Sequence, residues 1–283
     1  MIKLCAFADE SSASLEGQIE ALKRNGIDYL ELRSVDGKNV SKLTDDECFA
    51  IYDKLKAADI KVWSIGSPLG KVDIECDFEE YKKTAKRICK IAKIFHTDKI
   101  RMFSFFNAYK KGEKVHKYLK EFTDIAKDEN VTMYHENEKD IYGDVLKRVV
   151  EILDFNSELH CVYDPANYIQ TGEYADDTLN ALVDRTDYFH IKDVIRSTGE
   201  LVPAGFGDGK IDKLIDMIGN RNVVLSVEPH LAIFKGFSQI DNTEMKNKFA
   251  FSSNEEAFDT AVASLKSLLK KAGYKEENKI FIK

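Results

Sequence analysis

Acidic and imidazole side chains stand at the ends of four short apolar runs between residues 131 and 228. These residues are Glu136, Asp164, His190 and Glu228. Three carboxylates and one imidazole form a hard, mostly oxygen-donor set that suits Mn²⁺, Mg²⁺ or Co²⁺, with Zn²⁺ as a further candidate. Without a cation, three carboxylates in a partly dry pocket would repel one another. The set predicts one divalent metal ion, provided that the fold brings the four runs together.

The pattern of apolar residues indicates how these runs are arranged. Short β-branched runs alternate strictly with longer amphipathic segments rich in Lys and Glu. The predicted strands are residues 2–8, 27–33, 60–65, 99–105, 131–136, 159–164, 188–192 and 223–228. The predicted helices are residues 15–25, 45–58, 78–95, 114–128, 144–153, 176–183, 211–218 and 254–272. Eight strand–helix repeats in 283 residues predict an α/β fold, a (β/α)8 TIM barrel that forms a single domain over residues 1–283.

In such a barrel the carboxyl ends of the strands share one rim, where active sites gather. The four metal-compatible residues belong to the fifth to eighth predicted strands. Side chains alternate along a strand, so Glu228 shares its face with Ser226 and His190 shares its face with Tyr188. A single acid at a strand end is commonly a helix N-cap or an ion-pair partner. Four candidates on consecutive strands favour a metal site instead.

Composition narrows the function classes. The formal net charge is −7, which argues against a nucleic-acid partner. The five cysteines are scattered and show no Cys-x-x-Cys spacing, so neither a disulfide framework nor a thiolate zinc site is expected. The apolar stretch at the start is too short for a signal-peptide core, and no stretch is long enough to span a membrane. We expect a cytoplasmic protein that acts on a small molecule, and homo-oligomerisation stays open.

At its most specific segments the chain resembles the xylose isomerase-like TIM-barrel superfamily. These segments are His135-Glu136-Asn137, Asp164-Pro165-Ala166-Asn167, His190-Ile191-Lys192-Asp193 and Val227-Glu228-Pro229-His230. The superfamily includes sugar phosphate isomerases and epimerases, ketose 3-epimerases, inosose dehydratases and endonuclease IV. The resemblance covers essentially the whole chain. It implies that Glu136, Asp164, His190 and Glu228 hold one divalent metal, with Mn²⁺ favoured.

The resemblance also implies an activity and a substrate class. It implies a metal-dependent isomerase or epimerase of a sugar, sugar phosphate or polyol, in which Glu136 and Glu228 are candidate bases that transfer protons through an enediolate. A lyase or dehydratase acting on a keto-sugar, keto-inositol or glycoside is the alternative. An endonuclease IV-like repair enzyme is remote, because the chain has only six histidines. A non-catalytic sugar binder is also remote.

Three positions test the likeness to ketose 3-epimerases. Arg196 stands six residues after the histidine ligand, where those enzymes carry an arginine that contacts substrate. Asn167 stands where they usually carry a histidine, and Tyr142 where they carry a glutamate. The metal site therefore carries over, while a ketose 3-epimerase assignment does not. Asn167 still donates hydrogen bonds, so it is expected to contact a polyol hydroxyl.

Further polar and aromatic residues are weaker candidates for substrate binding. Glu31 ends the second predicted strand beside Arg33, so either substrate contact or an internal ion pair is expected. Lys192 is expected to bind an anion or to pair with a carboxylate, and His230 to reach the pocket. Trp63 is expected either to stack on a sugar ring or to pack in the core.

Two loops also carry expectations. The segment 205–209 has three glycines, which is typical of a phosphate-binding loop, although a tight turn into the next helix explains it equally well. The segment 229–253 is long and aromatic and directly follows Glu228. We expect it to form a lid or a pocket wall, because long loops in compact domains are commonly functional.

Overall fold

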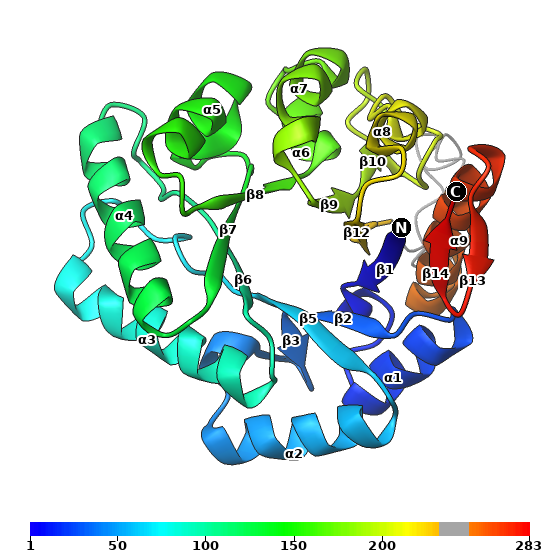
Figure 1. Ribbon diagram of the computed structural model, residues 1–283, viewed down its shortest axis with the longest axis horizontal. Helices are drawn as coiled ribbons and strands as arrows, with labels where there is room; N and C mark the ends of the chain where they lie inside the picture. The colour runs from blue at the N-terminus through cyan, green and yellow to red at the C-terminus, as the bar shows by residue number, and fades with distance from the viewer. Residues whose placement is uncertain (232–248) are drawn as a thin grey trace, which may run out of the picture.

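Eight parallel strands close into a barrel in the computed structural model, which describes residues 1–231 and 249–283 (Figure 1). In chain order they are β1 (Ile2–Ala6), β2 (Tyr29–Leu32), β5 (Lys61–Gly66), β6 (Lys99–Met102), β7 (Thr132–Glu136), β8 (His160–Tyr163), β9 (Tyr188–Ile191) and β12 (Val223–Val227). Neighbours in sequence are neighbours in the sheet, and β1 pairs with β12 to close it. The predicted (β/α)8 barrel is thus confirmed.

Helices surround this barrel in the described residues (Figure 1). They are α1 (Leu15–Arg24), α2 (Asp45–Ala57), α3 (Phe78–Ile94), α4 (Gly112–Asp128), α5 (Leu146–Phe155), α6 (Pro165–Gln170), α7 (Ala175–Leu182), α8 (Ile211–Ile218) and α9 (Asn254–Lys271). The short helix α6 was not expected. It begins directly after β8, because Pro165 occupies its first turn and the Asp164 carboxylate accepts from the Asn167 backbone N–H.

Several short strands and 3-10 turns lie in the loops, and a C-terminal hairpin lies against β1. The antiparallel pairs β3 (Ser34–Val35) with β4 (Lys38–Asn39) and β10 (Asp193–Val194) with β11 (Leu201–Val202) lie outside the barrel sheet. Single turns of 3-10 helix cover Ala8–Glu10, Val40–Lys42, Tyr142–Asp144 and Val183–Arg185. A hairpin of β13 (Lys275–Glu277) and β14 (Ile280–Ile282) pairs with the start of β1.

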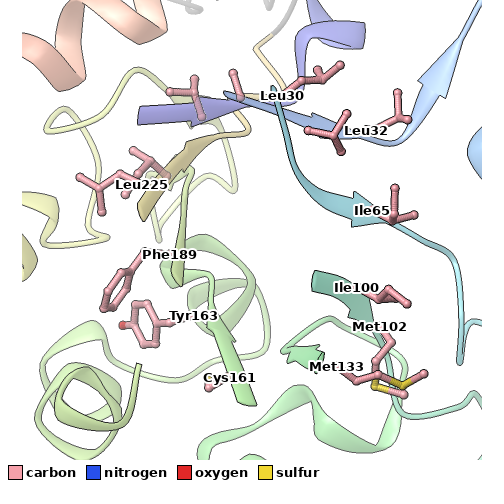
Figure 2. Packing of buried hydrophobic residues seen from close by; sticks show 14 of the residues in the cluster. Leu30, Leu32, Ile65, Ile100, Met102, Met133, Cys161, Tyr163, Phe189 and Leu225 are labelled. Carbon is pink, nitrogen blue, oxygen red and sulfur yellow. The ribbon is translucent and has the colours of Figure 1, made fainter. Parts of the chain in front are cut away.

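Alternation along the strands separates two apolar regions. Outward side chains such as Leu30, Ile65 and Leu225 fill the layer between strands and helices (Figure 2). Inward side chains form a smaller cluster in the barrel interior, made of Cys5, Tyr134, Val162, Tyr188 and Val224 with Tyr29 and Trp63 packed against it. Because neighbouring residues face opposite sides of a strand, Leu30 and Leu32 point to the helices while Glu31 between them points into the barrel.

Two further expectations concern the loop after β12 and membrane-spanning segments. Most of the aromatic loop expected to cover the site, residues 232–248, lies outside them, so its role as a lid stays a prediction. Among the described residues, no helix combines the length and the apolar character that a membrane span requires.

Candidate metal centre

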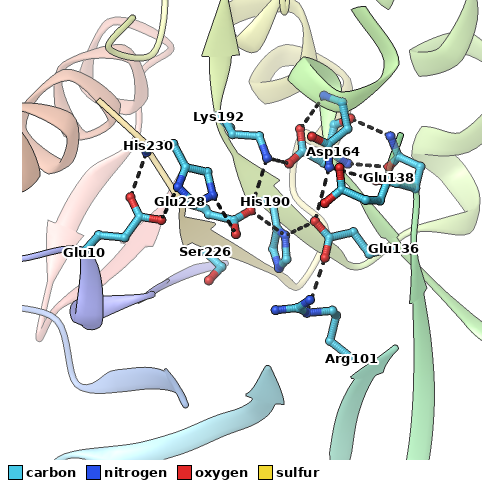
Figure 3. A network of polar contacts seen from close by, with 12 residues as sticks. Glu10, Arg101, Glu136, Glu138, Asp164, His190, Lys192, Ser226, Glu228 and His230 are labelled. Carbon is cyan, nitrogen blue, oxygen red and sulfur yellow. Dashed lines mark hydrogen bonds and ion pairs between the residues drawn. The ribbon is translucent and has the colours of Figure 1, made fainter. Parts of the chain in front are cut away.

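Four buried side chains converge at the carboxyl ends of β7, β8, β9 and β12. Glu136 is the last residue of β7, Asp164 follows β8, His190 lies within β9 and Glu228 follows β12. One ligand atom from each lies within 4.8 Å of the others. The His190 Nδ1 atom is 3.0 Å from Glu136 Oε1 and 3.3 Å from Glu228 Oε2 (Figure 3). Such a buried group of Glu, Asp, His and Glu is typical of a divalent metal site.

The chemistry of these donors fits a divalent cation. All four residues are at most 4 % exposed, so water cannot screen the three carboxylates from one another. Burial raises the pKa of Asp164 to about 6, against the opposing effect of Lys192. A divalent ion would replace this repulsion with attraction, and the carboxylate oxygens are the hard ligands that such ions prefer.

Cationic side chains surround the ligand group. Lys192 Nζ lies 2.7 Å from Asp164 Oδ2 and 3.5 Å from Glu228 Oε2. Arg101 Nε lies 3.3 Å from Glu136 Oε2. Although burial alone would raise the pKa of Glu136, the charges of His190 and Arg101 lower it to about 2. Both glutamate ligands are therefore ionised at neutral pH, since Lys192 likewise overcomes burial and holds the pKa of Glu228 well below its usual range.

Most of the expected substrate-binding residues lie beside this group. Asn167 Nδ2 donates to the Asn137 carbonyl at 2.8 Å and to Glu136 Oε1 at 3.4 Å. Lys192 pairs with Asp164, as the second of its two expected roles requires. His230 Nε2 lies 3.3 Å from Glu228 Oε1, and its side chain is 41 % exposed. His230 therefore stands between the buried ligands and the solvent.

Trp63 lies toward the opposite end of the barrel from the ligand group. Its ring contacts Tyr29 and Tyr188 edge-on, and Lys99 Nζ stands over it. Together with Tyr29 and Lys99 it borders a cavity of about 670 Å³ at the amino ends of β5 and β6. A bulge between Leu30 and Glu31 shifts the pairing of β2 with β5, so that Glu31 pairs with Ser64 and not with Trp63. Trp63 therefore lies nearer the amino ends of the strands than Glu31 does. Of its two expected roles, the geometry supports packing.

Arg196 also lies away from the ligand group. Its guanidinium donates to the backbone carbonyls of Gly172 and Glu173, after the end of α6, and stacks over the Tyr174 ring. The side chain is exposed and directed toward the loop between α6 and α7. The spacing that suggested substrate contact is present, but the structure does not bring Arg196 to the buried carboxylates.

Three charged residues of the site were missed from the sequence. Arg101 lies inside β6, where only the alternation of charged and apolar residues in the run 99–103 signals that it faces the barrel interior. Asp9 and Glu10 follow β1, so the rule that strand ends carry site residues applied to them as well. Arg33, at the end of β2, joins them, because its guanidinium pairs with Asp9, Glu10 and Glu228.

A second group of possible ligand atoms shares Glu228 with the first. Glu10, Glu228 and His230 each offer one atom within 4.8 Å of the others. Arg33 already stands among them, with Nη1 3.1 Å from Glu228 Oε1 and Nη2 3.3 Å from Glu10 Oε1. This guanidinium supplies the positive charge that the carboxylates need, so the group forms an ion-pair network beside the ligands.

The glycine-rich segment 205–209 binds the protein's own carboxylate. Asp193 is 1 % exposed, and its oxygens accept from the backbone N–H groups of Gly205, Gly207 and Gly209 at 2.8–3.0 Å. A Cβ atom at Gly207 would lie 2.3 Å from Asp193 Oδ1, which explains the glycine there. The loop is therefore an anion nest that Asp193 fills.

Comparisons with known proteins agree with this architecture. A family model described as xylose isomerase-like TIM barrel matches residues 19–268. No curated protein matches the chain. A solved probable 3-DHS dehydratase from Bacillus anthracis superimposes with a TM-score of 0.70 at 17% identity, over 95% of this chain and 98% of that one. The IOLI protein with a binding zinc atom gives 0.73 at 18%, over 95% and 99%. An L-ribulose 3-epimerase gives 0.68 at 15%, over 96% of each.

Proposed function

The chain belongs to the xylose isomerase-like TIM barrel family, and we propose that it is a divalent-metal-dependent isomerase or epimerase of a sugar, sugar phosphate or polyol. The observation that carries the proposal is the buried group of Glu136, Asp164, His190 and Glu228, with its ligand atoms within 4.8 Å of one another. Two of the similar structures are, by their names, an L-ribulose 3-epimerase and a D-allulose 3-epimerase. These likenesses support the substrate class.

The proposed cofactor is one divalent ion, with Mn²⁺ favoured and Mg²⁺, Co²⁺ and Zn²⁺ as alternatives. Glu136, Asp164, His190 and Glu228 would hold it. When bound, it supplies Lewis-acid stabilisation of negative charge on substrate oxygens. Lys192 and Asn167 would orient hydroxyl groups from the rim. His230 would contact the outer part of the substrate, because it is the most exposed of these residues.

Proton transfer is assigned to the two glutamates. Glu136 and Glu228 lie on either side of His190 (Figure 3), and both are ionised at neutral pH. A carboxylate beside the reacting carbon takes its proton, and the resulting enediolate is reprotonated at the same or a different position. Return from the opposite face gives epimerisation, and transfer to the neighbouring carbon on one face gives isomerisation.

A lyase is the second candidate, and two observations favour keeping it. The Tyr142 hydroxyl donates to Glu151 Oε1 at 2.9 Å, so the side chain at the position of the ketose 3-epimerase glutamate turns away from the site. His230 beside Glu228 keeps a raised pKa, because its ion pairs with Glu228 and Glu10 outweigh burial. A protonated His230 would suit protonation of a leaving hydroxyl.

Metal content tests the first part of the proposal. Protein purified without chelator, and metal-free protein reloaded with Mn²⁺, Co²⁺, Mg²⁺ or Zn²⁺, is analysed for bound metal after dialysis. We expect one ion per chain. The matched control is Asp164→Asn, which removes one charged ligand and should lower the affinity. Wild-type protein that retains none of the four metals would refute the proposal.

Exchange of substrate protons tests the chemistry. Metal-loaded protein is incubated with ketoses, aldoses and keto-polyols in deuterated water, and proton spectra report the products. An isomerase or epimerase incorporates deuterium next to the carbonyl and keeps every oxygen, whereas a lyase eliminates water. Glu136→Gln and Glu228→Gln should each lower the rate by about 10²–10⁴-fold even when saturated with metal. Glu121→Gln on α4 is the control. Unchanged exchange in both saturated variants would contradict the two-carboxylate mechanism.

A further inference from the structure

A further buried carboxylate, Glu31, lies behind His190, on the side away from the three carboxylate ligand candidates. Glu31 Oε2 and Oε1 are 3.1 and 3.3 Å from His190 Nε2. The other ring nitrogen, Nδ1, faces Glu136 and Glu228. The two nitrogens of an imidazole point in different directions, so one ion can use only one of them. Nδ1 is the nitrogen that faces the other ligands, which leaves Nε2 to Glu31.

Glu31 is fixed in this position by its surroundings. Its side chain is 0% exposed, and the Ser226 hydroxyl donates to Oε2 at 2.8 Å. Arg101 Nε stands 3.9 Å from Oε1, which is too far for a hydrogen bond. Glu31 has no access to a substrate at the rim and does not belong to the group of four ligands. Besides Ser226, the partner within hydrogen-bonding distance of both its oxygens is His190 Nε2.

The imidazole ring is held in one orientation. The rings of Phe7 and Tyr188 approach it edge-on, with centroids 5.1 and 5.4 Å away. These contacts hinder a ring flip that would exchange Nδ1 and Nε2. When a cation occupies Nδ1, the one proton of the neutral ring lies on Nε2, where the Glu31 carboxylate can accept it.

We propose that Glu31 is a positioning residue that accepts the Nε2 proton of His190 and leaves Nδ1 unprotonated toward the metal. The inference rests on the metal site of the proposed function and replaces the expected substrate contact of Glu31. A carboxylate that accepts from the distal nitrogen of a ligating histidine fixes its tautomer and raises its basicity. Ser226 would support this role by holding Glu31 in place.

The sharpest variant is Glu31→Gln. The amide keeps the size of the side chain, but its NH₂ group can donate to Nε2 and so stabilise the tautomer with the proton on Nδ1, where the metal must bind. We expect the affinity for Co²⁺ and Zn²⁺, measured by competition with a chelator, to fall by about 10–100-fold. The visible spectrum of the Co²⁺ protein should also shift, because the donor strength of His190 changes.

The matched control is Glu151→Gln. Glu151 also pairs with a histidine, His116 Nε2 at 2.7 Å, but it lies on α5 outside the barrel. This variant should keep wild-type affinity and spectrum. Ser226→Ala gives a graded test, since it removes one hydrogen bond to Glu31 and leaves the charge. Its loss of affinity should lie between those of the wild type and Glu31→Gln.

A measurement on the wild type keeps the inference testable if Glu31→Gln fails to fold. Nitrogen-15 spectra of the histidine-labelled Zn²⁺ protein should show His190 metallated at Nδ1 and protonated at Nε2. The opposite assignment would overturn the inference, as would unchanged Co²⁺ affinity and spectrum in folded Glu31→Gln. If wild-type protein binds no metal, the proposed function fails and this inference fails with it. If the wild type binds metal and Glu31→Gln has the same affinity and spectrum, this inference is overturned while the proposed function stands.

Discussion

At the scale of single residues, the barrel mouth holds more acidic than basic side chains. Among the described residues, the permanent cations that pair with these acids are Arg33, Arg101 and Lys192, and the acids are Asp9, Glu10, Glu31, Glu136, Asp164 and Glu228. Histidines provide part of the missing charge, because the surrounding carboxylates hold the pKa of His190 well above its usual range despite burial. A site with this excess of buried carboxylates is prepared to gain a divalent ion.

Lys192 should be the main internal counter-ion of the metal-free protein. We expect Lys192→Met to lower the free energy of unfolding by about 3–5 kcal/mol, because it leaves Asp164 and Glu228 buried without their partner. Added metal should restore part of the loss. Urea unfolding with chelator and with metal measures both effects. The exposed pair of Lys213 with Asp176 offers the control Lys213→Met, for which about 1 kcal/mol or less is expected. Equal losses in the two variants would contradict this role.

His135 should make the protein sensitive to acid. Burial lowers its pKa from 6.5 to about 4, so between these values the unfolded chain binds more protons than the native one. Stability is therefore present above pH 6.5 and is lost as the pH falls toward about 4, by up to about 3 kcal/mol. Urea unfolding at several pH values in this window gives the free energy of unfolding as a function of pH. This free energy should fall less steeply toward low pH for His135→Asn than for the wild type. An identical slope would show that other groups cause the acid sensitivity.

At the scale of elements, the connections after the strands position the site. The β8–α6 junction uses Asp164 both as helix N-cap and as ligand candidate. The β9–β10 region places Lys192 in the barrel and Asp193 in the glycine-rich nest. At the end of β9, Lys192 thus points into the barrel and Asp193 points toward the loop 205–209. The hydrogen bonds of Asp193 to this loop hold the backbone that carries His190 and Lys192.

The nest should depend on the charge of Asp193. We expect Asp193→Asn to lower the free energy of unfolding by about 1–3 kcal/mol, because the amide nitrogen would face backbone N–H donors and leave them unsatisfied. Asp212→Asn, on the exposed side of α8, is the matched control and should have little effect. Denaturant titration compares the two. A loss no larger than that of the control would mean that the loop keeps its shape without the carboxylate.

At the scale of the whole molecule, the chain carries a net charge of −7. Its cationic site residues Arg33, Arg101 and Lys192 are already paired with carboxylates. Binding to a phosphate backbone needs lysine and arginine side chains that can exchange counter-ions. The superfamily that the chain resembles includes endonuclease IV, but this charge distribution argues against a nucleic-acid substrate.

The metal-loaded protein should therefore leave DNA intact. We expect no specific incision of a duplex that carries one abasic site, at any metal that the protein binds, and no salt-dependent binding above that of an acidic control protein. Gel electrophoresis of end-labelled strands measures the incision. Cleavage at the abasic site that is lost in Glu228→Gln would overturn the assignment to sugar chemistry.

The sequence by itself determined the repeat and the four ligand candidates. Eight strand–helix repeats favour a closed barrel over an open sheet, and each of Glu136, Asp164, His190 and Glu228 lies at or near the carboxyl end of its own strand. Closure then brings these ends to one rim whatever the details of the loops.

For the other candidate residues, the tertiary structure alone decided the position along the barrel axis and the contact partners of each side chain. Trp63 and Glu31 both face the interior, but the stagger and the bulge between β2 and β5 place one below the site and the other against His190. Arg196 has the expected spacing, yet its guanidinium donates to two backbone carbonyls of the loop that follows α6. Alternation specifies the face of a strand that a residue occupies. Strand register and contacts between residues distant in sequence specify what that residue touches. Neither can be inferred from a single sequence.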